Sequence, residues 1–314
     1  MLQVFTITGP VFIVIAIGFA AVRSRLFAKA DTRLLGKFAI NIALPAMLFK
    51  ALTERPFAEI LNTTYLLAYA IGSAAAFGIG VGVAHFVRKK SLRFSAVHGM
   101  GMSLSNSGFI GYPIVLQLLG PPAAIAMALC FLVENLLMLP LALSLAESSG
   151  NREAEKPLVV LLNTFARLGR NPLILAIGAG FACALLEIRP PAPLARAIDL
   201  LALAAAGVAL FVIGGTLVGL KVSGMLGDIA LIVAGKLLLH PLAVFAALAL
   251  LPPIDPTLRI AAITFACMPM FSIYPIVAQK YGHEEFCAAA LMAATVTAFF
   301  TISAAIWLLQ PDLN

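Results

Sequence analysis

The chain has 314 residues, of which 62% are hydrophobic and 11% are charged, and its mean hydropathy is +1.04. Soluble proteins carry roughly 25% charged residues, so this composition excludes a soluble globular domain and predicts a polytopic membrane protein. The net charge is +7, but the basic residues fall in loops between apolar segments. This pattern favours a role in membrane orientation and argues against a nucleic-acid partner.

Ten apolar segments predict an all-α membrane protein with ten transmembrane helices. Most of them exceed the ~20 residues that a helix needs to cross a bilayer. In chain order the segments are Val4–Val22, Leu34–Leu52, Thr63–Val87, Phe94–Leu119, Pro122–Leu145, Pro172–Leu186, Leu194–Val222, Met225–Leu251, Leu258–Tyr281 and Glu285–Leu309. The first segment runs into a basic loop without a small-residue cleavage site, so we interpret it as a mature span and not as a signal peptide.

The charges of the loops predict the orientation of these spans. The loops that follow the odd-numbered segments hold 15 Lys and Arg residues, whereas the loops on the opposite side hold 4. Because Lys and Arg are enriched in cytoplasmic loops, we expect both termini to lie outside the cytoplasm. The chain is expected to cross the lipid bilayer several times.

An internal repeat relates the two halves of the chain. The tetrapeptide Tyr-Pro-Ile-Val occurs at Tyr112–Val115 and again at Tyr274–Val277, an offset of 162 residues. Five spans per half is an odd number, so the second half must start from the opposite face of the membrane. We therefore predict inverted repeats at 1–146 and 171–314, joined by a cytoplasmic linker at 147–170.

The repeated tetrapeptides lie in stretches that a continuous membrane helix should avoid. Pro113 and Pro275 are expected to break or kink the fourth and ninth spans. Unwound backbone at membrane depth is tolerated where it is buried in protein or lines a cavity, which favours a transporter site at the breaks. The polar groups available there are Ser105, Asn106, Ser107, Ser272 and Tyr274. They are candidates to bind a substrate, or alternatively to satisfy the carbonyls that the breaks free.

Ionisable residues inside the spans are costly, and each is a functional hypothesis. Glu134 in the fifth span is either a carboxylate that carries a proton or coordinates a cation, or a structural residue that pairs with Lys236 or makes a polar contact between helices. Lys236 and His240 lie four residues apart and share one face of the eighth span. We expect Lys236 either to complement an anionic substrate or to form a structural ion pair. His240 precedes Pro241 and is expected to bond local backbone groups, with a coupling role as the alternative.

The remaining polar residues in the spans have simpler interpretations. Asn41 and Asn135 are further candidates for substrate binding, and Lys50 near the outer end of the second span is expected to snorkel to the interface. The four cysteines have no metal-like spacing and are interpreted as small core residues. The sequence contains no catalytic or phosphate-binding motif, so we predict neither an enzyme nor a bound metal or cofactor.

Several motifs, taken in order along the ten spans, are similar to those of a known family. They are Asn41-Ile-Ala-Leu-Pro45, Asn106 seven residues before Pro113, Arg170-Asn-Pro172, Lys236 five residues before Pro241, and Pro275-Ile-Val-Ala-Gln-Lys-Tyr281. Over nearly its whole length the chain resembles bacterial members of the auxin efflux carrier family. That family includes the plant PIN exporters and bacterial malate and malonate permeases.

The resemblance implies a two-bundle architecture like that of the bile-acid symporters and NhaA. Spans 1, 2, 6 and 7 would form a scaffold that also makes a homodimer, and spans 3–5 and 8–10 would form a mobile transport domain. Spans 4 and 9 would cross at their prolines, which places Asn106, Pro113 and Pro275 at the substrate site. Met268 stands where the 162-residue offset places the counterpart of Asn106, so the second half of the site is less polar.

These observations predict a secondary active transporter of small organic anions, either mono- or dicarboxylates, that works by elevator-type alternating access. A proton or a sodium ion would be the coupling ion. The alternatives are a sodium-coupled symporter of the bile-acid type and a membrane sensor that does not transport. A sensor is disfavoured because the chain carries no attached signalling domain.

Overall fold

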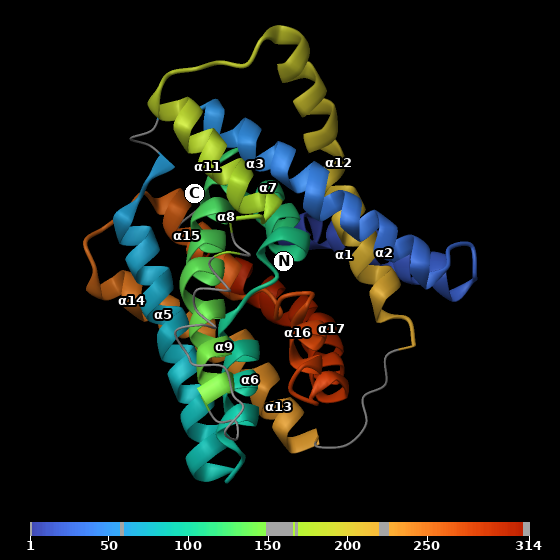
Figure 1. The fold of residues 1–314 in the computed structure, drawn as a ribbon, viewed down its shortest axis with the longest axis vertical. Coiled ribbons are helices and arrows are strands. Elements are labelled where there is room, and N and C mark those ends of the chain that lie inside the picture. The colour runs from blue at the N-terminus through green and yellow to red at the C-terminus, as the bar shows by residue number, and fades with distance from the viewer. Residues whose placement is uncertain (1, 57–59, 149–165, 167–168, 220–225, 310–314) are drawn as a thin grey trace. The chain divides into compact units, whose positions relative to one another are not determined.

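The computed structural model describes residues 2–56, 60–148, 166, 169–219 and 226–309 (Figure 1). Within these ranges the chain is helical and forms no β-strand, which confirms the predicted all-α fold. Most of the predicted linker at 147–170 lies outside the described residues.

Six helices are long and apolar enough to cross a membrane, judged by length and composition. They are Lys29–Thr53, Thr63–Val87, Pro122–Ser148, Ala192–Leu217, Leu226–Leu250 and Glu284–Leu309. Four shorter apolar helices accompany them, at Thr8–Arg23, Ser107–Leu119, Pro172–Leu185 and Pro256–Ala266. The predicted fourth and ninth spans are each interrupted: the first between Ser103 and Ser107, the second between Ala266 and Tyr274.

The described helices fall into two compact units. Unit 1 comprises Met1–Thr63, Ser107–Leu129 and Gly169–Gly219, and unit 2 comprises Thr64–Asn106, Cys130–Leu168 and Leu220–Asn314. Each unit therefore draws residues from both predicted repeats. Unit 1 also holds Ser107–Leu129, a segment that the family resemblance assigns to transport helices.

Unit 1 is built on close contact between α1 (Leu2–Arg23) and α12 (Ala192–Leu217) (Figure 1). A Cβ on Gly18 would lie 2.1 Å from the carbonyl oxygen of Phe211, and one on Gly214 would lie 1.9 Å from that of Ile15. Small residues let membrane helices approach until their backbones touch, and glycine is the residue that fits here. The other α-helices of this unit are α2 (Lys29–Phe38), α3 (Leu44–Thr53), α7 (Tyr112–Leu119), α11 (Pro172–Leu185) and the first part of α8 (Pro122–Leu132).

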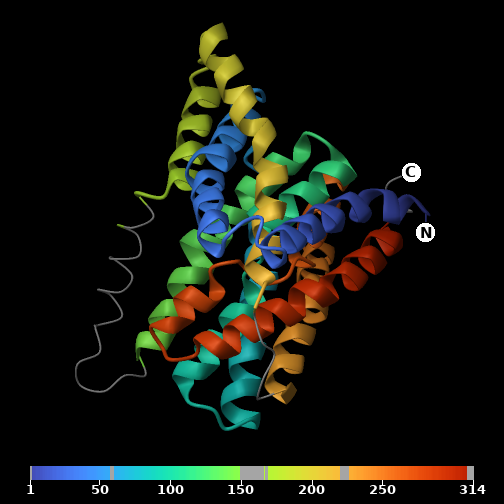
Figure 2. The same ribbon diagram turned by 90° about the vertical axis from the view of Figure 1, so that its right-hand side faces the viewer.

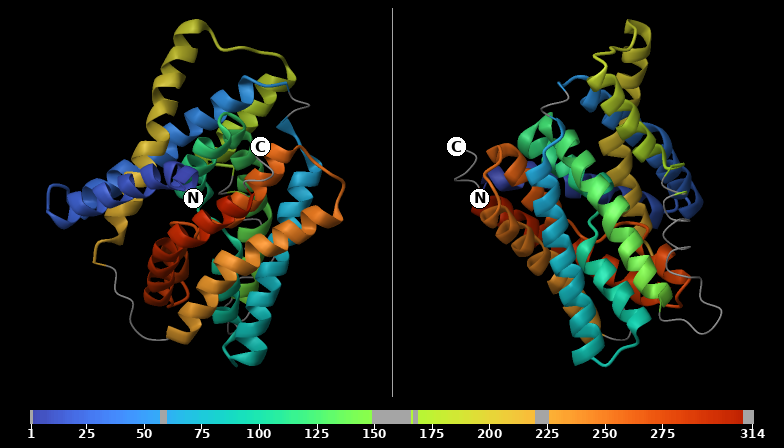
Figure 3. Two further views of the ribbon diagram at one scale, coloured as in Figure 1. Left: turned by 180° about the vertical axis from the view of Figure 1, so that it is seen from behind. Right: turned by 60° about the vertical axis from the view of Figure 1, so that its left-hand side comes forward.

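Unit 2 contains the helices that precede both interruptions and the helix that follows the second. It includes α5 (Thr63–Gly82), α6 (Leu92–Ser103), α9 (Leu139–Ser148), α13 (Leu226–Ala234), α14 (His240–Leu250), α15 (Pro256–Ala266), α16 (Tyr274–Gln279) and α17 (Glu284–Leu309). α17 packs across α13 (Figure 2). α14 crosses α5 (Figure 3) so closely that a Cβ on Gly72 would lie 2.6 Å from the Cα of Val244.

Several helices contain a π-helical segment. These are η1 (Ala39–Ala43), η2 (Val83–Val87), η3 (Ser107–Gly111), η4 (Val133–Met138) and η5 (Gly235–Leu239), and η4 joins α8 (Pro122–Leu132) to α9. Single π-helical turns inside α-helices occur frequently at functional sites. Glu134 and Asn135 lie on η4, and Lys236 lies on η5.

Candidate functional site

The two interruptions run beside each other inside unit 2. Beyond the end of α6 the chain is extended at Leu104, with φ −98° and ψ 127°. Ser105 then forms an isolated antiparallel bridge with Met270. The N–H of Asn106 donates a hydrogen bond of 2.8 Å to the carbonyl oxygen of Pro269. Backbone groups that each broken helix leaves unpaired are thus partly satisfied by the other break.

This crossing differs from the one we expected at the prolines. Pro275 is the second residue of α16, where the missing N–H of proline costs nothing and its fixed φ suits the helix. Pro113 is the second residue of α7, but α7 continues the π-helical segment Ser107–Gly111, so Pro113 lies inside the helix Ser107–Leu119. The crossing lies several residues before each proline, in the backbone at Ser105 and Met270.

Asn106 joins the breaks through its side chain as well. The residue is 3% exposed, and its amide nitrogen donates to the hydroxyl of Ser272 at 2.8 Å. Together with the backbone bond to Pro269, this contact holds the first break against the second. Two of the predicted site residues, Asn106 and Ser272, are therefore direct neighbours despite the 166 positions that separate them in the sequence.

Lys236 is fully buried and touches both breaks. Its ammonium lies 2.8 Å from the hydroxyl of Ser105, 2.9 Å from the carbonyl oxygen of Ala266 and 2.7 Å from Nδ1 of His240. An ammonium has three N–H donors, so these three acceptors satisfy it. Ala266 is the last residue of α15, where the helix dipole favours a positive charge.

His240 has side-chain partners instead of the local backbone partners that we expected. Because its Nδ1 faces the ammonium of Lys236, the hydrogen-bond pattern assigns the ring proton to Nε2. Nε2 then donates to the hydroxyl of Ser73 at 2.9 Å. The ring also packs against the ring of Tyr69, with 5.7 Å between the ring centroids.

Glu134 reaches the same place from η4. It is 3% exposed, and its Oε1 accepts hydrogen bonds from the hydroxyl of Tyr69 at 3.0 Å and from the N–H of Ser105 at 3.3 Å. The hydroxyl of Tyr69 also lies 3.2 Å from that of Ser105. Ser105 therefore stands between the carboxylate and Lys236, which interact electrostatically.

Tyr69 and Ser73 are members of the cluster that sequence reasoning missed. Both lie on α5 and are buried. With Tyr65 they form a series at i, i+4 and i+8, which places three hydroxyl groups on one face of an otherwise apolar helix. This i, i+4, i+8 spacing of hydroxyl-bearing residues is the sequence pattern from which Tyr69 and Ser73 could have been predicted.

Tyr274 anchors the second break. It is fully buried, and its hydroxyl donates to the carbonyl oxygen of Val97 on α6 at 3.0 Å. A Cβ on Gly101 would lie 2.6 Å from this hydroxyl, so glycine leaves the space that the phenol ring occupies. The bond to the backbone gives Tyr274 a structural role.

The other predicted residues bond within their own helices or belong to unit 1. Asn41 is exposed on η1 of unit 1 and donates to the carbonyl oxygen of Lys37 at 2.7 Å. Asn135 donates to that of Phe131 at 2.9 Å, also within its own helix. Ser107 and Pro113 are buried and belong to unit 1. The predicted residues gathered around the breaks of unit 2 are Ser105, Asn106, Glu134, Lys236, His240, Ser272 and Tyr274.

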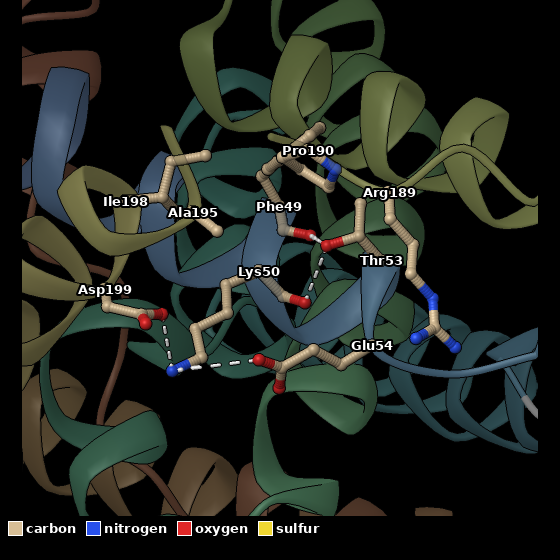
Figure 4. A pocket seen from close by; sticks show the side chains of 9 residues that line it. All are labelled: Phe49, Lys50, Thr53, Glu54, Arg189, Pro190, Ala195, Ile198 and Asp199. Carbon is tan, nitrogen blue, oxygen red and sulfur yellow. Dashed lines mark hydrogen bonds and ion pairs between the residues drawn. The ribbon is translucent and has the colours of Figure 1, made fainter. Parts of the chain in front are cut away.

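Lys50 lines a separate pocket of about 280 Å³ in unit 1 (Figure 4). Its ammonium pairs with Asp199 at 2.7 Å and lies 3.8 Å from a carboxylate oxygen of Glu54. Figure 4 shows the guanidinium of Arg189 directed away from this group. Lys50 is 36% exposed, and partly exposed ion pairs contribute little to stability. Lys50 therefore lies between two carboxylates, those of Asp199 and Glu54, whereas the predicted snorkelling included no such partners.

Two more acids are buried in unit 2. Asp228, on α13, accepts from Arg88 at 2.9 Å and from Lys90 at 3.0 Å. Glu147 pairs with Lys280 and accepts from the hydroxyl of Tyr281 at 3.0 Å. Like Glu134, Asp228 and Glu147 fall inside candidate membrane helices, at Leu226–Leu250 and Pro122–Ser148.

Comparison with known proteins identifies the family. The family described as "Membrane transport protein" matches residues 4–308. A "Putative malonate transporter" of Rhizobium meliloti (strain 1021) is 30% identical over 311 residues, which cover 99% of this chain and 97% of that protein. An "Uncharacterized transporter YfdV" of Escherichia coli (strain K12) is 24% identical, with 95% of each chain covered. A mouse "Lysosomal cholesterol signaling protein" is 29% identical, covering 74% of this chain and 28% of its own length.

The family match spans nearly the whole chain, and the relative from Rhizobium meliloti matches it almost end to end. The chain therefore belongs to the membrane transport protein family, the auxin efflux carrier family that its motifs resemble.

Proposed function

We propose that this protein is a secondary active transporter of small organic anions, mono- or dicarboxylates, in the cytoplasmic membrane of a bacterium. The observation that carries this proposal is the meeting of two non-helical stretches inside unit 2, at Ser105–Asn106 and Pro269–Met270. Polar backbone at membrane depth marks the binding sites of many secondary transporters. The likeness to a "Putative malonate transporter" supports a carboxylate as the substrate.

Asn106 and Ser272 are the residues that we propose to contact the anion. Asn106 directly precedes the helix Ser107–Leu119, and the N-terminal end of a helix favours a negative charge. Ser272 is partly exposed and shares a hydrogen bond with Asn106. A carboxylate would accept from the amide of Asn106, which now donates to Ser272, and from the hydroxyl of Ser272.

Lys236 would not contact the anion directly, but would act on it through its positive charge and through the backbone and side chains of the breaks that it holds in place. Its three N–H groups already have acceptors in Ser105, His240 and Ala266. A buried positive charge in surroundings of low dielectric still favours an anion nearby. Lys236 would thus position Ser105 and the end of α15 while it compensates part of the substrate charge.

The proposed transport cycle is an elevator-type alternation within a ten-helix inverted repeat. Scaffold spans 1, 2, 6 and 7 would also form a homodimer, and spans 3–5 and 8–10 would carry the substrate. The division of the chain into two compact units supports such a movement. The hydrogen-bonded series Ser73, His240, Lys236, Ser105 and Glu134 supports a proton as the coupling ion, with Glu134 and His240 as its carriers.

Uptake by proteoliposomes of the purified protein tests this proposal. We expect saturable uptake of radiolabelled malonate or another small carboxylate that an inward proton gradient changes and that empty liposomes lack. Uptake that depends on sodium at a clamped membrane potential would favour the bile-acid type of symporter. Saturable binding without uptake of any mono- or dicarboxylate would contradict transport and favour a membrane sensor.

A further inference from the structure

Helices α14, α15 and α17 of unit 2 enclose an apolar groove of about 550 Å³. This volume falls within the ~300–1,000 Å³ range of small-molecule sites. Its walls are mostly leucine, isoleucine, alanine, proline and phenylalanine side chains, with Cys267 and Thr301, and Arg259 is its only charged lining residue. Leu238, Leu242 and Leu308 are exposed along it, so the groove opens at the surface of the helix bundle. In a membrane-spanning chain that surface meets lipid.

Arg259 stands at one end of the groove, one turn into α15. Its guanidinium carbon lies 5.7 Å from the ring centroid of Phe245, a cation–π contact. Among the described residues no carboxylate pairs with it. Asp255, four positions earlier, instead accepts hydrogen bonds from the N–H groups of Thr257 and Leu258 at the start of α15. The charge of Arg259 is therefore available to an anion at the mouth of the groove.

The groove has the depth of one leaflet. It follows α15 from Arg259 to Cys267, a run of about 12 Å at ~1.5 Å per residue. Half of a hydrocarbon core of ~30 Å is about 15 Å. Arg259 lies near the loop between α14 and α15, where a side chain of this kind meets lipid headgroups. A headgroup phosphate and an acyl chain below it match this arrangement of charge and apolar wall.

We propose that this groove binds an anionic phospholipid, with its phosphate at Arg259 and one acyl chain along α15 toward Cys267. The inner end is bordered by Leu237 and Cys267, the residues that follow Lys236 and Ala266 in the chain. Lys236 and Ala266 are the two partners of the hydrogen bond that caps α15. The acyl chain would thus contact the outer wall of the buried polar cluster. This site is independent of the substrate that the protein transports.

The single tryptophan of the chain provides a reporter for this site. Trp307 is 50% exposed on α17, beside the lining residue Leu308. In detergent micelles, phosphatidylglycerol with brominated chains should quench its fluorescence at an about fivefold lower mole fraction than brominated phosphatidylcholine. That ratio corresponds to one Arg–headgroup contact.

Two pairs of variants separate the site from general lipid contact. Arg259→Gln should abolish the preference for phosphatidylglycerol, whereas Arg196→Gln, an exposed arginine on α12 that lines none of the pockets described above, should retain it. Ala304→Phe fills the groove and should remove the preferential quenching. Val296→Phe, exposed elsewhere on α17, should leave it unchanged.

Equal quenching of the wild type by both lipids would overturn the proposal. So would a preference that survives Arg259→Gln or Ala304→Phe in protein whose helical circular dichroism and melting temperature match the wild type. Loss of a dimer in Ala304→Phe with the lipid preference intact would assign the groove to a second copy of the chain. An Arg259→Gln variant that melts early is replaced by Arg259→Lys, which keeps the charge and should keep most of the preference.

Discussion

The ammonium of Lys236 lies 2.9 Å from the carbonyl oxygen of Ala266, the last residue of α15. A helix that ends inside a membrane protein leaves carbonyl groups that water cannot reach, and each unsatisfied group costs several kcal/mol. Lys236 supplies one of the missing donors and a positive charge at the negative end of the helix. The interruption of this span is thus stabilised by a lysine from another helix.

Replacement of Lys236 by alanine should destabilise the fold strongly. The change would leave the carbonyl oxygen of Ala266 and Nδ1 of His240 without their buried donor and Glu134 without its cation, at a cost of about 3 kcal/mol or more. The melting temperature of the purified protein measures this loss. Lys50→Ala is the matched control, because its partly exposed ion pair should contribute below ~1 kcal/mol. Similar losses for both variants would contradict the proposed role of Lys236.

Ser105 should couple Lys236 to Glu134 energetically. In a double-mutant cycle of Lys236→Ala and Glu134→Gln, we expect an interaction energy of roughly 0.5–3 kcal/mol. Ser105→Ala removes the hydroxyl that accepts from Lys236, so the same cycle in that background should give a smaller value. Additive effects in the wild-type background would show that the two residues act separately.

Gly101→Ala should disturb the second break from a distance. The new methyl group would lie 2.6 Å from the hydroxyl of Tyr274 and displace it from the carbonyl oxygen of Val97. Overpacking of this kind costs roughly 1–3 kcal/mol, visible as a lower melting temperature. Gly78→Ala is the control, because no atom lies within 4 Å of the position of its Cβ. We expect it to be neutral or slightly stabilising in a helix.

The charge asymmetry of the loops predicts that both termini lie outside the cytoplasm. A reporter that is active only in the cytoplasm should therefore be silent when it is fused after Asn314, and a periplasmic reporter should be active there. Fusion of the same reporters after Gly150, in the predicted linker, should give the reverse pattern. Cytoplasmic activity at Asn314 would invert the predicted orientation.

Local patterns in the sequence predicted the helices and the two interrupted spans, since hydropathy and proline act within a few residues. The same patterns placed Lys236 and His240 on one helix face, where they now contact each other. The sequence did not predict which backbone groups pair at the crossing, because the bridge between Ser105 and Met270 joins positions far apart in the chain. Pro113 and Pro275 correctly indicated which spans are interrupted, but the backbone pairing lies at Ser105 and Met270 and not at the prolines.

The rest of the candidate site depends on packing between helices. Tyr69 and Ser73 look like ordinary residues of an apolar span until α5 brings them to Glu134 and His240. Asn135 lies beside Glu134 in the sequence, yet its side chain donates a hydrogen bond to the carbonyl oxygen of Phe131 in its own helix. The π-helical segments that carry Glu134 and Lys236 are each followed by a proline, Pro140 or Pro241, at the second position of the next α-helix.

The most direct test of the central claim compares Asn106→Ala with Asn135→Ala in proteoliposomes, using the initial rate of carboxylate uptake against substrate concentration. Both variants remove one asparagine amide from unit 2, but only Asn106 reaches the second break, through Ser272 and Pro269. A hydrogen bond to a charged group contributes ~1.5–3 kcal/mol, so Asn106→Ala should lower the apparent affinity about tenfold or more, while Asn135→Ala should transport like the wild type. Equal affinity in both variants, at equal melting temperature, would contradict a substrate site at the crossing.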